Sequence, residues 1–153
     1  MISQLPAILI AEDDDNDALL LQRTLRKICP TVAIQIVVDG EKAIQYLAGS
    51  GKYADRSCYP FPDVVMTDIK MPQKSGFEVL DWIKHNTECR VIPIIVWSSS
   101  AEESDVVRAY ELGANCYFQK PLSQDWEETV KLIVNFWKAA RIAHLKSRIN
   151  RLT

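Results

Sequence analysis

The chain has 153 residues, a formal net charge of −2 and 48% hydrophobic residues, which suits one soluble globular domain around one core. This nearly balanced charge gives no reason to expect nucleic acid or an anionic membrane as a partner. The four cysteines stand far apart without a CxxC pair, so neither a zinc site nor a disulfide framework is expected. The first residues lack the basic leader of a signal peptide, and we expect a cytoplasmic location.

The first half of the chain alternates short apolar runs with helical periodicity. Ala7–Ala11 is a continuous apolar run of strand length, and the apolar residues that follow it recur at helical spacing until Pro30. The β-branched residues of Ala33–Val38 predict a second strand, and Gly40–Ala48 predicts a helix. A long loop is predicted between residues 49 and 62.

The second half of the chain repeats this alternation. Further strands are predicted at Asp63–Thr67, Val91–Trp97 and Asn115–Phe118. Helices are predicted at Phe77–Lys84, Glu102–Leu112 and from Asp125 onward. Strands that alternate with helices predict an α/β fold, in which a parallel sheet is covered by helices on both faces.

Polar residues directly follow four of the predicted strands. Glu12 and Asp13 follow the first strand, and Asp68 follows the third. Ser98 follows the fourth strand and Lys120 follows the fifth. Because open parallel sheets bind ligands beyond the carboxyl ends of their strands, we expect these side chains to meet on one rim.

Taken singly, these polar residues have ordinary structural interpretations. Asp14 or Asp15 suits the N-cap of the first helix, and Asp68 alone suits a turn. Ser100 and Glu103 have the spacing of a capping box. Their combination on one rim instead favours a functional interpretation.

Phosphoryl transfer to a carboxylate is the chemistry that fits this set. Clustered carboxylates attract a cation, and hard oxygen ligands suit Mg²⁺. The cation would allow Asp68 to attack phosphorus as a nucleophile. Lys120 and Ser98 would then hold the phosphoryl oxygens by charge and hydrogen bonding.

Four segments in order carry a resemblance to a known family: ILIAEDD, DVVMTDIKMPQKSG, VIPIIVWSSS and GANCYFQKP. Asp68 and Ser98 are 30 residues apart, and Ser98 and Lys120 are 22 apart. Over residues 6–137 the chain resembles the receiver domain of bacterial response regulators. The resemblance implies one receiver domain over residues 1–153, with a flavodoxin-like (βα)5 fold and the strand order 2-1-3-4-5.

The resemblance also implies a role for each matched residue. Asp68 is the expected phospho-acceptor, with Ser98 and Lys120 holding the phosphoryl group and Tyr117 acting with Ser98 as the switch. Mg²⁺ or Mn²⁺ is the expected cofactor. Its expected ligands are Glu12 through water, Asp13, Asp68 and the backbone carbonyl of Lys70.

The function implied by the resemblance is that of a single-domain response regulator, which accepts a phosphoryl group from a sensor histidine kinase and is not otherwise an enzyme. The loop 49–62 and the DIKMP motif are similar to regulators of phytochrome-type kinases. One alternative is a receiver-shaped scaffold that works without phosphorylation. Another is an aspartate-nucleophile phosphatase, but that class has a second Asp where this chain has Lys70.

Residues 138–153 are predicted to extend the final helix, because they carry basic residues and an apolar stripe at helical spacing. A frayed, solvated tail is one interpretation. The other is an exposed amphipathic helix that pairs with a second copy to form a homodimer, or that docks on a partner. Direct DNA binding is not expected, because no recognition-helix pattern accompanies these charges. No membrane association is expected.

Overall fold

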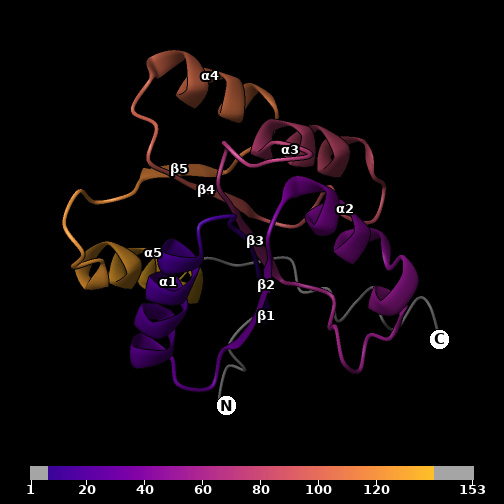
Figure 1. Cartoon of the computed structure of the whole chain (residues 1–153), viewed down its shortest axis with the longest axis horizontal. Coiled ribbons are helices and arrows are strands. Elements are labelled where there is room, and N and C mark those ends of the chain that lie inside the picture. Colours follow the sequence, from indigo (N-terminus) through magenta and orange to yellow (C-terminus); the bar gives the residue numbers. More distant parts are fainter. Residues whose placement is uncertain (1–6, 140–153) are drawn as a thin grey trace.

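The computed structural model describes residues 7–139, in which five parallel strands form one sheet in the order β2-β1-β3-β4-β5. This order confirms the expected flavodoxin-like fold (Figure 1). The strands are β1 (Ala7–Ala11), β2 (Ala33–Val37), β3 (Val64–Thr67), β4 (Ile94–Ser98) and β5 (Cys116–Gln119). The helices are α1 (Asp15–Ile28), α2 (Gly40–Ala48), η1 (Gly51–Ala54), α3 (Gly76–His85), α4 (Glu103–Glu111) and α5 (Glu127–Ala139). The predicted extension of α5 lies outside the described residues beyond Ala139.

Two apolar layers cover the sheet, one on each face. Alternate residues of a strand point to opposite faces, so Ile8 and Ile10 of β1 enter one layer while Leu9 enters the other. The first layer is packed against α1 and α5, and the second against α2, α3 and α4 (Figure 1). No helix within residues 7–139 has the length and apolarity needed to cross a lipid bilayer.

The main boundary error concerns β4, which begins at Ile94 and not at Val91 as the apolar run predicts. Pro93 has no N–H to donate to a neighbouring strand, so it cannot extend the ladder as an ordinary strand residue. Val91 is 42% exposed, which also separates it from the buried strand that follows. Hydrophobicity alone therefore placed the start of this strand too early.

The helix caps agree with the sequence in one case and differ in another. The Asp14 carboxylate accepts a hydrogen bond from the backbone N–H of Asp17 at 2.9 Å, which confirms it as the N-cap of α1. The predicted capping box of Ser100 and Glu103 is wrong, because α4 begins after Glu102 and has no side-chain cap. The Ser100 hydroxyl instead donates to the Asp105 carboxylate at 2.6 Å.

The segment between α2 and β3, predicted as a loop, contains η1 and is held by one cation. The Arg56 guanidinium donates to three main-chain carbonyls, those of Tyr46 at 2.9 Å, Leu47 at 3.1 Å and Tyr59 at 3.4 Å. The rings of Tyr46, Tyr53 and Tyr59 pack against one another beside it. Arg56 thus adds donors at the end of α2, where the backbone N–H of Gly49 also donates to the Tyr46 carbonyl at 3.1 Å.

Candidate functional site

The end of β1 places one buried and one exposed carboxylate. The backbone N–H of Glu12 continues the sheet by donating to Val37 at 3.0 Å, and the Glu12 side chain turns into the protein. Asp13 follows immediately and is exposed. One Glu12 oxygen accepts the backbone N–H of Asp14 at 3.1 Å, so the start of α1 helps to fix this carboxylate.

The end of β3 places Asp68 next to β1. The backbone N–H of Asp68 donates to Ala11 at 3.0 Å, and one carboxylate oxygen accepts the N–H of Ile69 at 2.6 Å. Gly76 at the start of α3 closes on this turn, since a Cβ there would lie 2.0 Å from the Asp68 carbonyl oxygen. Only glycine permits this close approach, which explains why Gly76 ends the segment DVVMTDIKMPQKSG.

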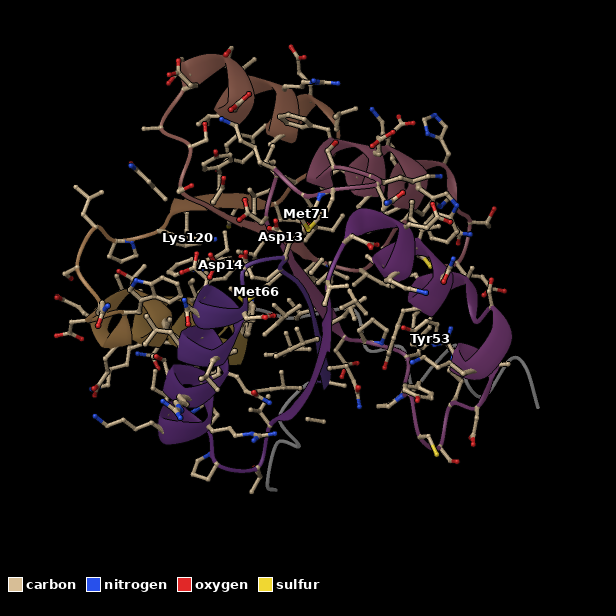
Figure 2. All side chains as sticks on the ribbon, in the orientation of Figure 1. Asp13, Asp14, Tyr53, Met66, Met71 and Lys120 are labelled. Carbon is tan, nitrogen blue, oxygen red and sulfur yellow. The ribbon has the colours of Figure 1, made fainter. Side chains whose placement is uncertain are left out.

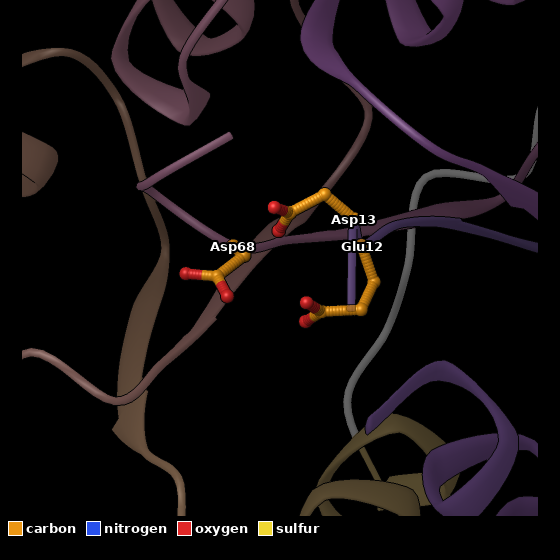
Figure 3. A group of neighbouring side chains, drawn as sticks. All are labelled: Glu12, Asp13 and Asp68. Atoms are coloured by element: carbon orange, nitrogen blue, oxygen red, sulfur yellow. The ribbon is translucent and has the colours of Figure 1, made fainter. Parts of the chain in front are cut away.

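Carboxylates from both strand ends surround one space, as Figure 3 shows. One oxygen from each of Glu12, Asp13 and Asp68 lies within 4.8 Å of the others. Hard oxygen donors at this separation, with an exposed side open to water, fit Mg²⁺ or Mn²⁺. Lys70 is exposed two residues beyond Asp68, and the role of its carbonyl stays a prediction.

Lys120 supplies the positive charge at the same rim. Its ammonium donates to Glu12 at 2.7 Å, to Asp68 at 2.7 Å and to Asp17 at 2.9 Å. Burial disfavours the charged form, but the hydrogen bonds to Asp17, Asp68 and Glu12 outweigh it and raise the pKa of Lys120. In Figure 2, Lys120 is labelled where the chain leaves β5, on the same side of the view as Asp14 at the start of α1.

Asp17 is the site residue that the sequence did not reveal. Its place in the first turn of α1 has a sufficient explanation in the helix dipole, which favours acidic residues there. The available signal was geometric, because α1 begins at the rim where the strands end. A first-turn carboxylate on the inner side of α1 can therefore reach Lys120, 103 residues away.

Burial controls the proton affinity of Glu12. Loss of solvent raises the pKa of Glu12 to about 7, against the hydrogen bond from Lys120, and the nearby charge of Asp68 raises it further. Carboxylates are crowded here beyond what one ammonium neutralises. Such a rim favours a second cation.

The hydroxyl and the aromatic residue expected to form a switch are linked through Ser100. The Ser98 hydroxyl accepts the backbone N–H of Ser100 at 3.2 Å, and the Tyr117 hydroxyl donates to the Ser100 carbonyl at 2.8 Å. Ser98 is buried at the end of β4, and its carbonyl accepts the N–H of Lys120 at 2.8 Å. The loop after β4 thus connects Ser98 at the rim to the ring of Tyr117.

Comparison with known proteins agrees with this geometry. The response regulator receiver domain matches residues 8–131 of the chain. The chain belongs to the response regulator receiver family. Phosphorylation-based signalling is what this family membership fits, and the rim of this chain carries the carboxylates of Glu12 and Asp68 and the ammonium of Lys120.

Several relatives belong to one subgroup of this receiver family. Response regulator Rcp1 of Synechocystis sp. is 35% identical over 131 residues, which cover 85% of this chain and 87% of Rcp1. The phosphorylated cyanobacterial phytochrome response regulator RcpA has a TM-score of 0.85 at 32% identity, covering 92% of this chain and 99% of RcpA. The Mn²⁺-bound form of Rcp1 has a TM-score of 0.82 at 33% identity, with 91% and 99% covered. The resemblance to regulators of phytochrome signalling is therefore confirmed.

Proposed function

We propose that this protein is a single-domain response regulator whose phospho-acceptor is Asp68. The observation that carries the proposal is the contact of Lys120 with Asp68 at 2.7 Å, inside a rim that also holds Glu12 and Asp13. A receiver-shaped scaffold without phosphorylation would not need this buried cation beside the acceptor. An aspartate-nucleophile phosphatase lacks support as well, because Lys70 stands where its second acidic residue would be.

The proposed reaction moves a phosphoryl group from a phosphohistidine to Asp68. A carboxylate oxygen of Asp68 attacks phosphorus and forms the new O–P bond while the P–N bond breaks. The electron pair stays on the imidazole nitrogen, which takes up a proton. Lys120 and Ser98 hold the phosphoryl oxygens, and movement of the Ser98 hydroxyl is transmitted through Ser100 to Tyr117.

A divalent cation, Mg²⁺ or Mn²⁺, completes the proposed site. Asp13 and Asp68 hold it directly, the carbonyl of Lys70 provides a further oxygen, and Glu12 acts through water. When bound, the cation supplies positive charge that offsets the charge of the phosphoryl oxygens. The exposure of Asp13 leaves this side of the site open to solvent and to an incoming phosphodonor.

The proposed phosphodonor is a sensor histidine kinase of the phytochrome type. The names of RcpA and of RPA3017, a regulator in red light signalling of R. palustris that matches with a TM-score of 0.84, support this partner. A groove between α1 and the segment after β5 borders the acceptor rim, and Leu19 and Leu122 line it. Leu122 is fully exposed, which makes this groove the proposed contact for the kinase.

We also propose that the protein works in the cytoplasm, has no enzymatic output of its own and binds neither DNA nor membrane. Its proposed output is a changed surface, including pairing with a second copy through α5. Leu132 and Phe136 of α5 are 62% and 56% exposed, which supports an interface on this helix. Size exclusion before and after phosphorylation tests the homodimer.

Intact mass measurement tests the acceptor directly. The chain is incubated with Mg²⁺ and phosphoramidate, in parallel with Asp68→Asn, and both are weighed. Wild type is expected to gain one phosphoryl group, and Asp68→Asn none. Absence of the gain in wild type, with Mg²⁺ binding shown by calorimetry, would overturn the proposal in favour of the scaffold.

A further inference from the structure

The ammonium of Lys120 has no donor left for a phosphoryl group. An ammonium has three N–H donors, and here each one is matched by a separate carboxylate, from Glu12, Asp17 and Asp68. The Lys120 side chain is only 6% exposed, so water does not readily replace these partners. A phosphoryl group on Asp68 can be held by Lys120 only if one of these bonds is exchanged.

Of the two partners of Lys120 that are not the proposed phospho-acceptor, Asp17 is the one that Lys120 can release at the lower cost. The Glu12 side chain is 2% exposed, so water could not replace Lys120 as its partner. An unpaired carboxylate at that depth would be strongly destabilising. The Asp17 side chain is 34% exposed, so water can solvate it after the bond breaks. Between Glu12 and Asp17, the more exposed Asp17 is therefore the one to exchange.

We propose that Asp17 is a positioning residue that occupies one N–H of Lys120 in the resting protein and yields it to the phosphoryl group. The proposal rests on Asp68 being the phospho-acceptor, and it assigns Asp17 a role in the phosphorylation step. Asp17 holds the ammonium at the rim until the phosphodonor arrives. It also competes with that donor, because its own negative charge lies at the same ammonium.

This competition predicts that removing Asp17 speeds phosphorylation by small phosphodonors. Asp17→Ala frees one N–H of Lys120 and removes one negative charge from the approach of a phosphoryl dianion. The half-saturating concentration of phosphoramidate is expected to fall by roughly three- to tenfold, in keeping with a unit charge at a partly screened site. Asp17→Asn, which keeps a weaker acceptor, is expected to give an intermediate value.

Asp15→Ala is the matched control, since Asp15 lies in the same first turn of α1 and carries the same charge. Its carboxylate is exposed and makes no hydrogen bond or ion pair with any residue between 7 and 139. A change of less than about twofold is expected for this variant, because it alters only the general field near the rim. Thermal unfolding of each variant separates an effect on folding from an effect on the half-saturating concentration.

A double-mutant cycle shows whether Asp17 acts through Lys120. In the Lys120→Met background, Asp17→Ala is expected to leave the half-saturating concentration within twofold, because the shared partner is gone. An Asp17→Ala value equal to that of Asp15→Ala, or higher than wild type, would overturn the proposal. If wild type itself takes no phosphoryl group, the proposed function fails first, so the two failures are distinguishable.

Discussion

Two cationic side chains, Lys120 and Arg56, each donate several hydrogen bonds, but to different kinds of acceptor. This difference distinguishes a side chain suited to function from one suited to holding the structure. Lys120 at the rim of the sheet is bonded to carboxylates, which carry more negative charge than it can neutralise. Arg56 in the segment after α2 is bonded to main-chain carbonyls, which carry no net charge. In Figure 2, Lys120 is labelled beside α1. Tyr53, a residue of η1 close to Arg56 in the sequence, is labelled on the opposite side of the view.

The surplus of charge makes the bonds of Lys120 exchangeable. A carboxylate that loses Lys120 can bind a metal ion or be solvated, and the 34% exposure of the Asp17 side chain permits the latter. The carbonyls held by Arg56 have no such alternative, because they form the end of a helix and the turn after it. Lys120 is therefore suited to a reaction, and Arg56 is suited to holding a segment in place.

The largest expected effect is on the rim. Lys120→Met removes the ammonium from Asp68, and the phosphorylation rate with phosphoramidate is expected to fall about tenfold or more. Lys74→Met is the matched control, since Lys74 pairs with Glu41 on the exposed surface at 3.2 Å. If the phosphorylation rate of Lys120→Met is close to that of Lys74→Met, Lys120 has no special role in phosphorylation.

The next effect is on stability at the other cation. Arg56→Ala removes the guanidinium donors from the carbonyls of Tyr46, Leu47 and Tyr59 and is expected to lower the free energy of unfolding by about 1–3 kcal/mol. Urea denaturation measures this change. The phosphorylation rate is expected to stay within twofold of wild type, and a larger change in rate would contradict a purely structural role. Arg56→Lys is the control for charge without the planar guanidinium fork.

Ser100 tests whether charge is what distinguishes Lys120, because its side chain is neutral and lies near the rim. Ser100→Ala removes the hydroxyl from Asp105 and is expected to cost about 1 kcal/mol in unfolding free energy. Ser100→Thr, which retains a hydroxyl, is expected to keep more of the stability. A fall in the phosphorylation rate of Ser100→Ala comparable to that of Lys120→Met would show that charge is not what distinguishes the rim.

The smallest effect is a pH dependence in the aromatic cluster. Burial raises the pKa of Tyr46 to about 12 from its ordinary value of 10, and its hydroxyl donates to the Pro60 carbonyl at 2.7 Å. The neutral form is favoured in the folded chain, so its stabilising effect is complete below pH 10 and is lost as pH rises toward 12. Ultraviolet titration of wild type and Tyr46→Phe checks this, and identical curves above pH 10 would contradict it.

The sequence predicted the fold and most of the rim because both follow from topology. Parallel strands bring their carboxyl ends to one edge, so Asp68 and Lys120 meet there although they are 52 residues apart. The resemblance supplied the strand order, which the structure confirms. The roles assigned to Ser98, Tyr117 and Lys70 remain proposals, because they concern a phosphorylated state.

Side-chain contacts that depend on the angle of a helix could not be predicted. Asp17 and Ser100 each had a sufficient local explanation, as a helix-dipole residue and as a cap, and no pattern in the sequence favoured the contacts that they make. Arg56 lies in a segment without periodicity, so its position at the end of α2 was also hidden. These contacts depend on how neighbouring elements pack, which residue spacing does not specify.

Glu12 and Lys120 are 108 residues apart in the sequence, although the Lys120 Nζ lies 2.7 Å from the Glu12 Oε2. This separation has a consequence for folding during synthesis on the ribosome. A nascent chain that has emerged through β4 already carries its crowded carboxylates but not the ammonium that neutralises them. The mutual repulsion of Glu12 and Asp68 then opposes closure of β1 on β3. Charge compensation arrives only with Lys120, directly after β5, so emergence of this segment from the ribosome is expected to coincide with the final stabilisation of the sheet.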